Sequence, residues 1–158
     1  MFIAVFLVGL VLDQLNKWFV HTHMLYQQSI PIIKNIFHLT YTRNTGAAWS
    51  MLSGHSWLFI ILAVFVVGVI LYVVRQIPKE DRLLRGTLGA FAAGALGNMI
   101  DRVARGWVVD FFDFRIFPVF NIADCLIVIS VILLIWQILF QGKLVNEYKG
   151  KKEDEQAK

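Results

Sequence analysis

Two aspartates stand out because they flank a short aromatic segment that leads into a long apolar run. Asp110 lies in VVDFFDF (residues 108–114), and Asp124 ends FNIAD (residues 120–124). Charged carboxylates are costly at the edge of a bilayer, so such residues are candidates for function. If the two share a site, repulsion and partial burial keep one carboxyl protonated while the other is ionised. The ionised one can take a proton from water and the protonated one can polarise a carbonyl, which is aspartyl-protease chemistry.

A third acid, Asp113, follows Asp110 closely and could be mistaken for its partner. We expect a solvent-facing loop carboxylate there that pairs with Arg115, since exposed ion pairs are common and contribute little to stability.

The composition indicates an integral membrane protein of single-domain size. Of 158 residues, 58% are hydrophobic and only 16% are charged, and the mean hydropathy is +0.64. The basic residues lie between and after the apolar runs rather than on one amphipathic face, which argues against nucleic-acid binding. With one cysteine and no HExxH among the four histidines, we expect no disulfide, metal site or cofactor.

The apolar runs predict an all-α membrane protein, a bundle of four transmembrane helices at 2–20, 57–74, 84–100 and 122–140. The third run is rich in Gly and Ala, which permit close helix contact, so we place it at the centre of the bundle. The first run carries Asp13 and Lys17 and no small-residue cleavage motif follows it, so we interpret it as a retained span.

The positions of basic residues predict the orientation. Arginines and lysines gather in the loop at 75–85 and in the tail, so both termini should be cytoplasmic. The connections at 21–56 and 101–121 then lie outside, although Arg102, Arg105 and Arg115 run against the charge rule there. Residues 36–43 alternate apolar and polar side chains, which predicts a strand in a small extracytoplasmic β-strand platform. Residues 1–142 would form one membrane domain, and the charged tail at 143–158 would be disordered.

The polar residues of three predicted spans fall at one depth. At about 1.5 Å per residue, Asp13 lies about 18 Å and Asn98 about 21 Å up a hydrocarbon core about 30 Å thick. Asp101 and Arg102 follow at the outer end of the third span, and Asp124 begins the fourth. Each could be structural: Asp13 and Lys17 could neutralise each other, and Asn98 and Asn121 could join helices. Their convergence in the outer half, with no comparable set in the inner half, favours a functional site.

Two other classes of function compete with the peptidase. A proton-coupled transporter also uses intramembrane carboxylates, but it predicts polar residues throughout the membrane thickness. A non-enzymatic membrane scaffold would explain the spans and the strand, but it would not need two acids flanking a turn.

Five segments together resemble the lipoprotein signal peptidase (signal peptidase II) family. They are DQLNK (13–17), RNTGAAW (43–49), GALGNMIDR (94–102), VVDF (108–111) and FNIAD (120–124), in the family's order and rough spacing. The resemblance implies a bacterial inner-membrane aspartyl endopeptidase that removes signal peptides from prolipoproteins, cutting just before a cysteine that carries a diacylglyceryl group.

The resemblance also implies roles for particular residues and partners. Asp110 and Asp124 match the family's catalytic aspartates. Residues matching its supporting positions are Asp13, Lys17, Asn44, Gly46, Ala47, Asn98, Asp101, Arg102, Asn121 and Ala123. The expected partners are diacylglyceryl-modified prolipoproteins, membrane lipids and globomycin-type cyclic peptide inhibitors. We expect a monomer, because one bundle holds all the motifs.

Overall fold

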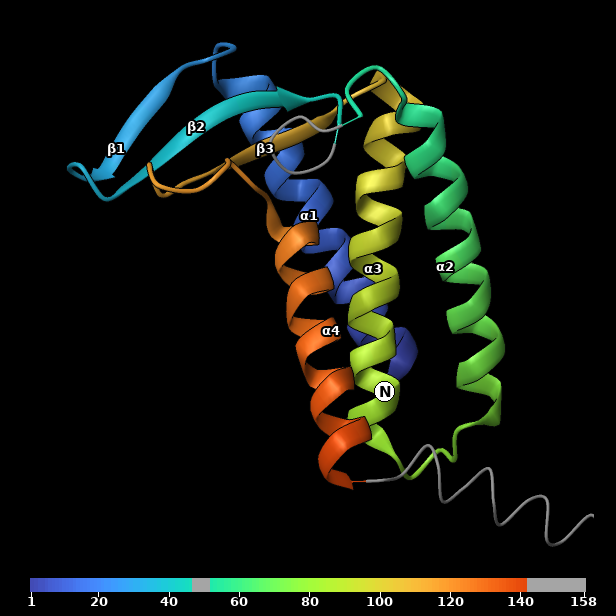
Figure 1. The fold of residues 1–158 in the computed structure, drawn as a ribbon. Helices are drawn as coiled ribbons and strands as arrows, with labels where there is room; N and C mark the ends of the chain where they lie inside the picture. The colour runs from blue at the N-terminus through green and yellow to red at the C-terminus, as the bar shows by residue number, and fades with distance from the viewer. Residues whose placement is uncertain (47–51, 142–158) are drawn as a thin grey trace, which may run out of the picture.

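Four helices form a bundle, and a three-stranded sheet projects from one end of it (Figure 1). The computed structural model describes residues 1–46 and 52–141. Site residue Ala47 and the tail at 143–158 lie outside these ranges. In chain order the elements are α1 (Phe2–His23), β1 (Ser29–Ile33), β2 (Phe37–Asn44), α2 (Ser56–Gln76), α3 (Arg82–Arg105), β3 (Val108–Asp113) and α4 (Ile122–Gln141).

Three of the helices are long and apolar enough to cross a membrane. Within the ranges that the structure describes, these are α1, α2 and α4, and most of their apolar residues point away from the protein. The third predicted span also forms a helix, α3, but it is not among the three, because its glycines, Asn98 and its charged residues lower its hydropathy. The chain is therefore a mostly helical membrane protein with three candidate spans.

Helix α3 is the centre of the bundle, as its small residues predicted. It packs against α1, α2 and α4, whereas α2 packs mainly against α3. Glycines allow the close approach: a Cβ on Gly89 would lie 2.6 Å from the carbonyl oxygen of Phe2, and one on Gly94 would lie 2.5 Å from that of Ala123. The helix extends beyond the predicted span at 84–100: it continues to Arg105, and its C-cap is Gly106, whose φ is 82°. That left-handed conformation suits glycine.

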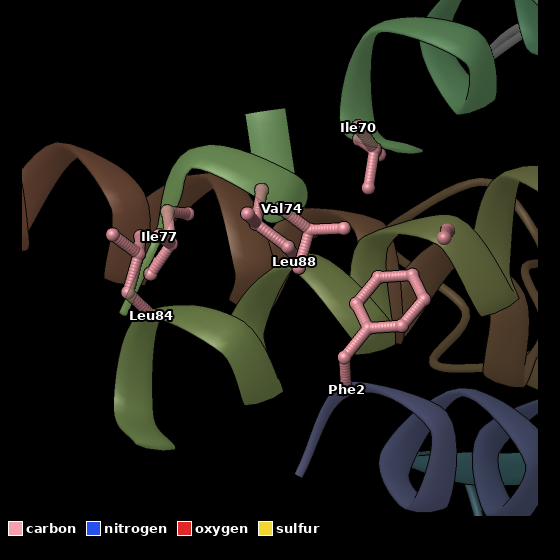
Figure 2. Packing of buried hydrophobic residues seen from close by; sticks show 7 residues of the cluster. Phe2, Ile70, Val74, Ile77, Leu84 and Leu88 are labelled. Atoms are coloured by element: carbon pink, nitrogen blue, oxygen red, sulfur yellow. The ribbon is translucent and has the colours of Figure 1, made fainter. Parts of the chain in front are cut away.

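An apolar cluster holds the end of the bundle opposite the sheet. Figure 2 shows Phe2 of α1 facing Ile70 and Val74 of α2, with Leu88 of α3 between the helices. Their burial removes apolar surface from solvent and packs α2 on α3. Arg85 of α3 adds polar contacts at this end, since it donates to the carbonyl oxygens of Val74 (2.8 Å) and Ile77 (2.7 Å).

The sheet is antiparallel, with strand order β1-β2-β3. The predicted strand at 36–43 corresponds to β2, within a residue at each end. Strands β1 and β3 lie in segments interpreted only as connections, and β3 contains Asp110. Alternation does not reveal β3, because five of its six residues are buried, on both faces. On one face, Tyr41, Val109 and Phe111 pack against Val20 and Met24 near the end of α1.

A bulge on β2 sets which way Asp110 points. Phe112 and Asp110 are two residues apart on β3, but their partners Leu39 and Thr42 are three apart on β2. The extra residue therefore lies on β2. Because side chains alternate along an unbroken strand, Asp110 and Phe112 share one face of the sheet, and their partners share it with them.

The close approach at Gly89 yields a stability prediction. Gly89→Ala places a methyl group against backbone, so we expect the free energy of unfolding in detergent to fall by about 1–3 kcal/mol. Gly68→Ala on α2 is the matched control, because a Cβ there meets nothing within 4 Å. Equal stability of the two variants would contradict the packing described for α3.

Candidate functional site

Asp124 is held by the first turn of the helix that it begins. The backbone N–H of Asp124 donates to Asn121 Oδ1 (3.0 Å), and the backbone N–H of Asn121 donates to Asp124 Oδ2 (3.1 Å). This reciprocal pair is a capping box, which satisfies donors that a helix N-terminus otherwise leaves free. The segment NIAD therefore both starts α4 and orients a carboxylate at its positive end.

Asp110, on β3, contacts the same asparagine, Asn121, that binds Asp124. Its Oδ1 accepts from Asn121 Nδ2 (2.6 Å), and its Oδ2 accepts from Asn44 Nδ2 (2.9 Å) at the end of β2. Asn121 thus contacts both aspartates, one through its side-chain amide and the other through its backbone. The structure therefore brings together two acids from consecutive elements, Asp110 of β3 and Asp124 of α4.

Asn98 joins this pair to the rest of the bundle. Its Nδ2 donates to Asp124 Oδ1 (2.7 Å), while its Oδ1 accepts from Asn121 Nδ2 (3.2 Å) and from Lys17 Nζ (2.8 Å). Because the oxygen has two donors, the amide nitrogen must point at Asp124. Lys17 therefore fixes the orientation of Asn98, which fixes a donor on Asp124.

Lys17 is the centre of a buried ion cluster. The Lys17 ammonium lies 2.9 Å from Asp13 Oδ2 and 3.3 Å from Asp101 Oδ2, and all three side chains are 0–1% exposed. Arg105 binds the other Asp101 oxygen at 2.5 Å. Two acids and two bases leave this cluster neutral, which limits the cost of burying its charges.

The two acids of this cluster also bind backbone donors near the catalytic candidates. Asp13 Oδ1 accepts from the N–H of Ala123 (2.9 Å), next to Asp124. Asp101 Oδ2 accepts from the N–H of Val109 (3.1 Å), next to Asp110. The ion cluster therefore positions the chain on the N-terminal side of each candidate aspartate.

A cavity of about 380 Å³ opens beside the aspartates. Its polar end holds the two carboxylates, and its walls are apolar side chains of α2, α4 and the segment before α4. The lining residues used below are Asn98, Arg102, Asp110, Asp124, Phe59 and Phe120. Both aspartates therefore face one space that is large enough for part of a substrate.

Arg102 holds the rim of this cavity. Its guanidinium donates to the carbonyl oxygen of Gly46 (2.8 Å) and lies 4.6 Å from the centre of the Phe59 ring on α2. Gly46 in turn donates its N–H to Asn44 Oδ1 (2.9 Å), which orients the amide that binds Asp110. The segment after β2 is thus tied to both α3 and Asp110.

Asp110 is 1% exposed, and its environment favours the protonated form. Burial, followed by the negative charge of Asp124, raises the pKa of Asp110 to about 7, against the lowering effect of hydrogen bonds from Asn44 and Asn121. A carboxyl with a pKa near neutrality can give or take a proton at physiological pH.

Asp113 does not belong to the pair, but its predicted exposure was wrong. It is 5% exposed, because it lies in β3 rather than in a loop. The expected pairing with Arg115 is present at 2.9 Å, and Thr40 donates a further hydrogen bond. Burial alone would raise the pKa of Asp113, but the bonds from Thr40 and Arg115 together lower it.

Of the predicted site residues, every one that the structure describes lies in this connected network or against it. Sequence reasoning missed Gln14, whose amide donates to Asp13 and to the Gly97 carbonyl oxygen, and it missed Gly97 itself. A Cβ on Gly97 would collide with Asp13 Oδ2. The sequence contains a signal for this contact: Gly97 lies beside Asn98 on the central helix, and a residue without a side chain there leaves room for an acid on α1.

Buried polar residues also occur toward the other end of the bundle, where no comparable set was expected. Gln137 of α4 donates to Thr87 of α3 (3.2 Å), and Ser130 is buried nearby on α4. These three are uncharged, so the charged cluster is still found only at the sheet end of the part described.

Comparison with known proteins identifies relatives along most of the chain. The family described as "Signal peptidase (SPase) II" matches residues 5–140. The chain is 45% identical over 138 residues to a lipoprotein signal peptidase of Moorella thermoacetica (strain ATCC 39073 / JCM 9320), covering 87% of this chain and 92% of that one. It is 46% identical over 138 residues to a lipoprotein signal peptidase of Shouchella clausii (strain KSM-K16), covering 87% and 91%.

Two solved structures share the fold. Both are described as bacterial membrane enzymes whose structures were obtained by the in meso method. The one at 2.3 Å resolution has a TM-score of 0.83 and 36% identity, covering 87% of each chain. The one at 1.9 Å has a TM-score of 0.80 and 36% identity, covering 88% of this chain and 92% of that one.

The buried ion cluster yields a second stability prediction. Lys17→Met leaves Asp13 and Asp101 without their shared ammonium, so we expect the free energy of unfolding in detergent to fall by about 3–5 kcal/mol. The matched control is Lys79→Met in the exposed turn before α3, which should change it by less than about 0.5 kcal/mol. A Lys17 variant as stable as this control would show that the cluster does not hold the bundle.

Proposed function

The chain belongs to the signal peptidase II family, and on that premise we propose that it is an aspartyl endopeptidase that cleaves prolipoproteins just before their diacylglyceryl-modified cysteine. Membership of the family makes it a peptidase that removes signal peptides from lipoproteins. The observation that carries the aspartyl mechanism is that Asp110 and Asp124 line one cavity and that Asn121 binds both.

In the proposed reaction the two aspartates act as a dyad. Asp124, which accepts hydrogen bonds from Asn98 and Asn121, takes a proton from water, and the water oxygen attacks the scissile carbonyl carbon. Asp110 holds a proton and donates a hydrogen bond to the carbonyl oxygen as negative charge develops there. When the tetrahedral intermediate collapses, the C–N bond breaks and a proton passes to the amine of the cysteine. The pair titrates as a unit, so each apparent pKa belongs to both groups.

The surroundings of the dyad support this substrate. The apolar walls of the cavity come from α2 and α4, which face lipid on their other sides, so acyl chains on the cysteine find apolar contact beside the scissile bond. The tie from Arg102 to Gly46 holds the segment after β2 at the cavity rim, where it can meet an extended peptide.

The orientation in the membrane follows from the same premise. We infer that α3 crosses the membrane with the other helices, giving four spans in one domain at 1–142, with both termini cytoplasmic. The site then lies near the outer face of a bacterial inner membrane, where a lipid-anchored cysteine presents its peptide bond. We further propose that the protein acts as a monomer and that globomycin-type cyclic peptides inhibit it by occupying the cavity.

The first test compares three aspartates with purified protein and a prolipoprotein substrate, followed by gel shift. We expect Asp110→Asn and Asp124→Asn each to lower cleavage by at least about 10³-fold, because neither amide can exchange a proton. Asp113→Asn is the control and should cleave normally. Only substrate that carries the diacylglyceryl group should be cut. Normal cleavage by either Asn variant, with folded yield unchanged, would rule out the dyad.

The second test uses pH. Since the reaction needs protonated Asp110, and its pKa is about 7, kcat/KM should fall as pH rises above about 7. Asn44→Ala removes a hydrogen bond that lowers this pKa, so the falling limb should move to higher pH even where the absolute rate drops. In Asp113→Asn the limb should stay in place. A limb that Asn44→Ala leaves unmoved would argue against Asp110 as the group that carries the proton.

A further inference from the structure

Arg43 lies beside the candidate site but points away from it. It is the neighbour of Asn44 at the end of β2, and it pairs with Val109 of β3. Because side chains alternate along a strand, Arg43 shares the face of Tyr41 rather than that of Asp110. The Arg43 side chain is exposed, and no acid pairs with it among the described residues. The proposed reaction therefore leaves this cation without a role.

Aromatic rings hold the Arg43 guanidinium. Its central carbon lies 4.8 Å from the centre of the Tyr26 ring and 4.8 Å from that of the Trp107 ring. Its Nε donates to the hydroxyl oxygen of Tyr41 at 3.3 Å. A guanidinium stacks on rings with its flat face while its edge donates hydrogen bonds, and a lysine ammonium does not offer this combination. The contacts therefore suit arginine rather than any cation.

The two rings belong to segments that adjoin the candidate site. Trp107 immediately precedes β3, the strand that carries Asp110. Tyr26 follows α1, and its ring meets the ring of Tyr41 edge-on, with the centres 6.1 Å apart. Arg43 thus joins the end of β2 both to the corner before β3 and to the segment after α1.

The bulge on β2 leaves the end of this strand with little backbone pairing. It interrupts the ladder between Leu39 and Thr42, and only three pairs follow it, those of Thr42, Arg43 and Asn44. A shift of register by one residue turns each side chain to the opposite face, so it would separate the Arg43 guanidinium from both rings. The ring contacts therefore favour the register in which the Asn44 amide binds Asp110.

We propose that Arg43 is a positioning residue, which holds the register of β2 beyond the bulge through Tyr26 and Trp107 and so keeps the Asn44 amide on Asp110. Arg43 does not line the cavity, so its removal should act on the reaction only through Asn44. The effect on cleavage rests on the proposed function, whereas the effect on the Asn44 amide does not.

Nuclear magnetic resonance tests the position of the amide without any cleavage. In protein with isotope-labelled asparagine side chains, the Asn44 amide signal is the one that Asn44→Gln removes. Arg43→Leu should move this signal toward its position in Asp110→Ala, where the amide has lost its carboxylate acceptor. Lys34→Leu is the matched control, because it removes an exposed cation from the turn after β1, and it should leave the signal in place. A signal that Arg43→Leu leaves unmoved, or moves in another direction, would overturn the proposal.

Two further variants test whether the rings matter rather than the charge. Arg43→Lys keeps the charge but loses the stacked arrangement, so it should move the Asn44 signal in the same direction as Arg43→Leu. Tyr26→Ala should do the same, whereas Tyr26→Phe keeps the ring and should not. An unmoved signal in Arg43→Lys would show that the charge suffices and would overturn the role of the rings.

A double-mutant cycle tests whether Arg43 acts through Asn44 in cleavage. Arg43→Leu should lower kcat/KM several-fold and move its falling limb to higher pH, as expected for Asn44→Ala. In the Asn44→Ala background, Arg43→Leu should have no further effect, because the amide that it positions is absent. Additive losses with an unmoved limb would show that Arg43 only stabilises the fold, which would overturn the proposal. If the unaltered chain cleaves no prolipoprotein, the proposed function fails, and the Asn44 signal still tests the position of the amide.

Discussion

The Lys17 ammonium is buried, and the fold supplies its hydrogen-bond acceptors. Its three acceptors come from two helices: Asp13 from α1, and Asn98 and Asp101 from α3. Each of these three residues also bonds to an element that carries or adjoins a catalytic candidate. Asp13 reaches the backbone at the start of α4, Asp101 reaches the backbone of β3, and Asn98 reaches Asp124. A single buried charge therefore fixes the relative placement of three helices and a strand, and the catalytic candidates stand at the ends of its chains of bonds.

Asp124 also has two roles, because its carboxylate both caps helix α4 and faces the cavity. Its Oδ2 completes the capping box that starts α4, while its Oδ1 binds Asn98 and the residue lines the cavity. Asp110 is held by side-chain amides alone, is more deeply buried and has a raised pKa. Two identical side chains thus have different neighbours, and those of Asp110 favour its protonated form.

Much of this arrangement could be predicted from the sequence, because bilayers constrain sequences strongly. Apolar runs located all four helices, alternation located β2, and a depth estimate brought Asp13, Asn98 and Asp124 together. Strand β3 was not predicted, because its residues are buried on both faces and so lack the alternation of apolar and polar side chains that identifies a strand. The burial of Asp113 was missed for the same reason. The cavity could not be predicted, since its walls depend on how far α2 lies from α4, and no local pattern records that distance.

The bulge on β2 makes the number of residues from Leu39 to Asn44 critical, because that number sets the register of β2 against β3. Loops on a protein surface usually accept a residue more or less, but the stretch from Leu39 to Asn44 cannot, because each residue added or lost turns every side chain beyond it to the opposite face. Asn44 would then point away from Asp110, and Arg43 would point toward it. The length of this short stretch therefore matters to the candidate site as much as the identity of the residues in it.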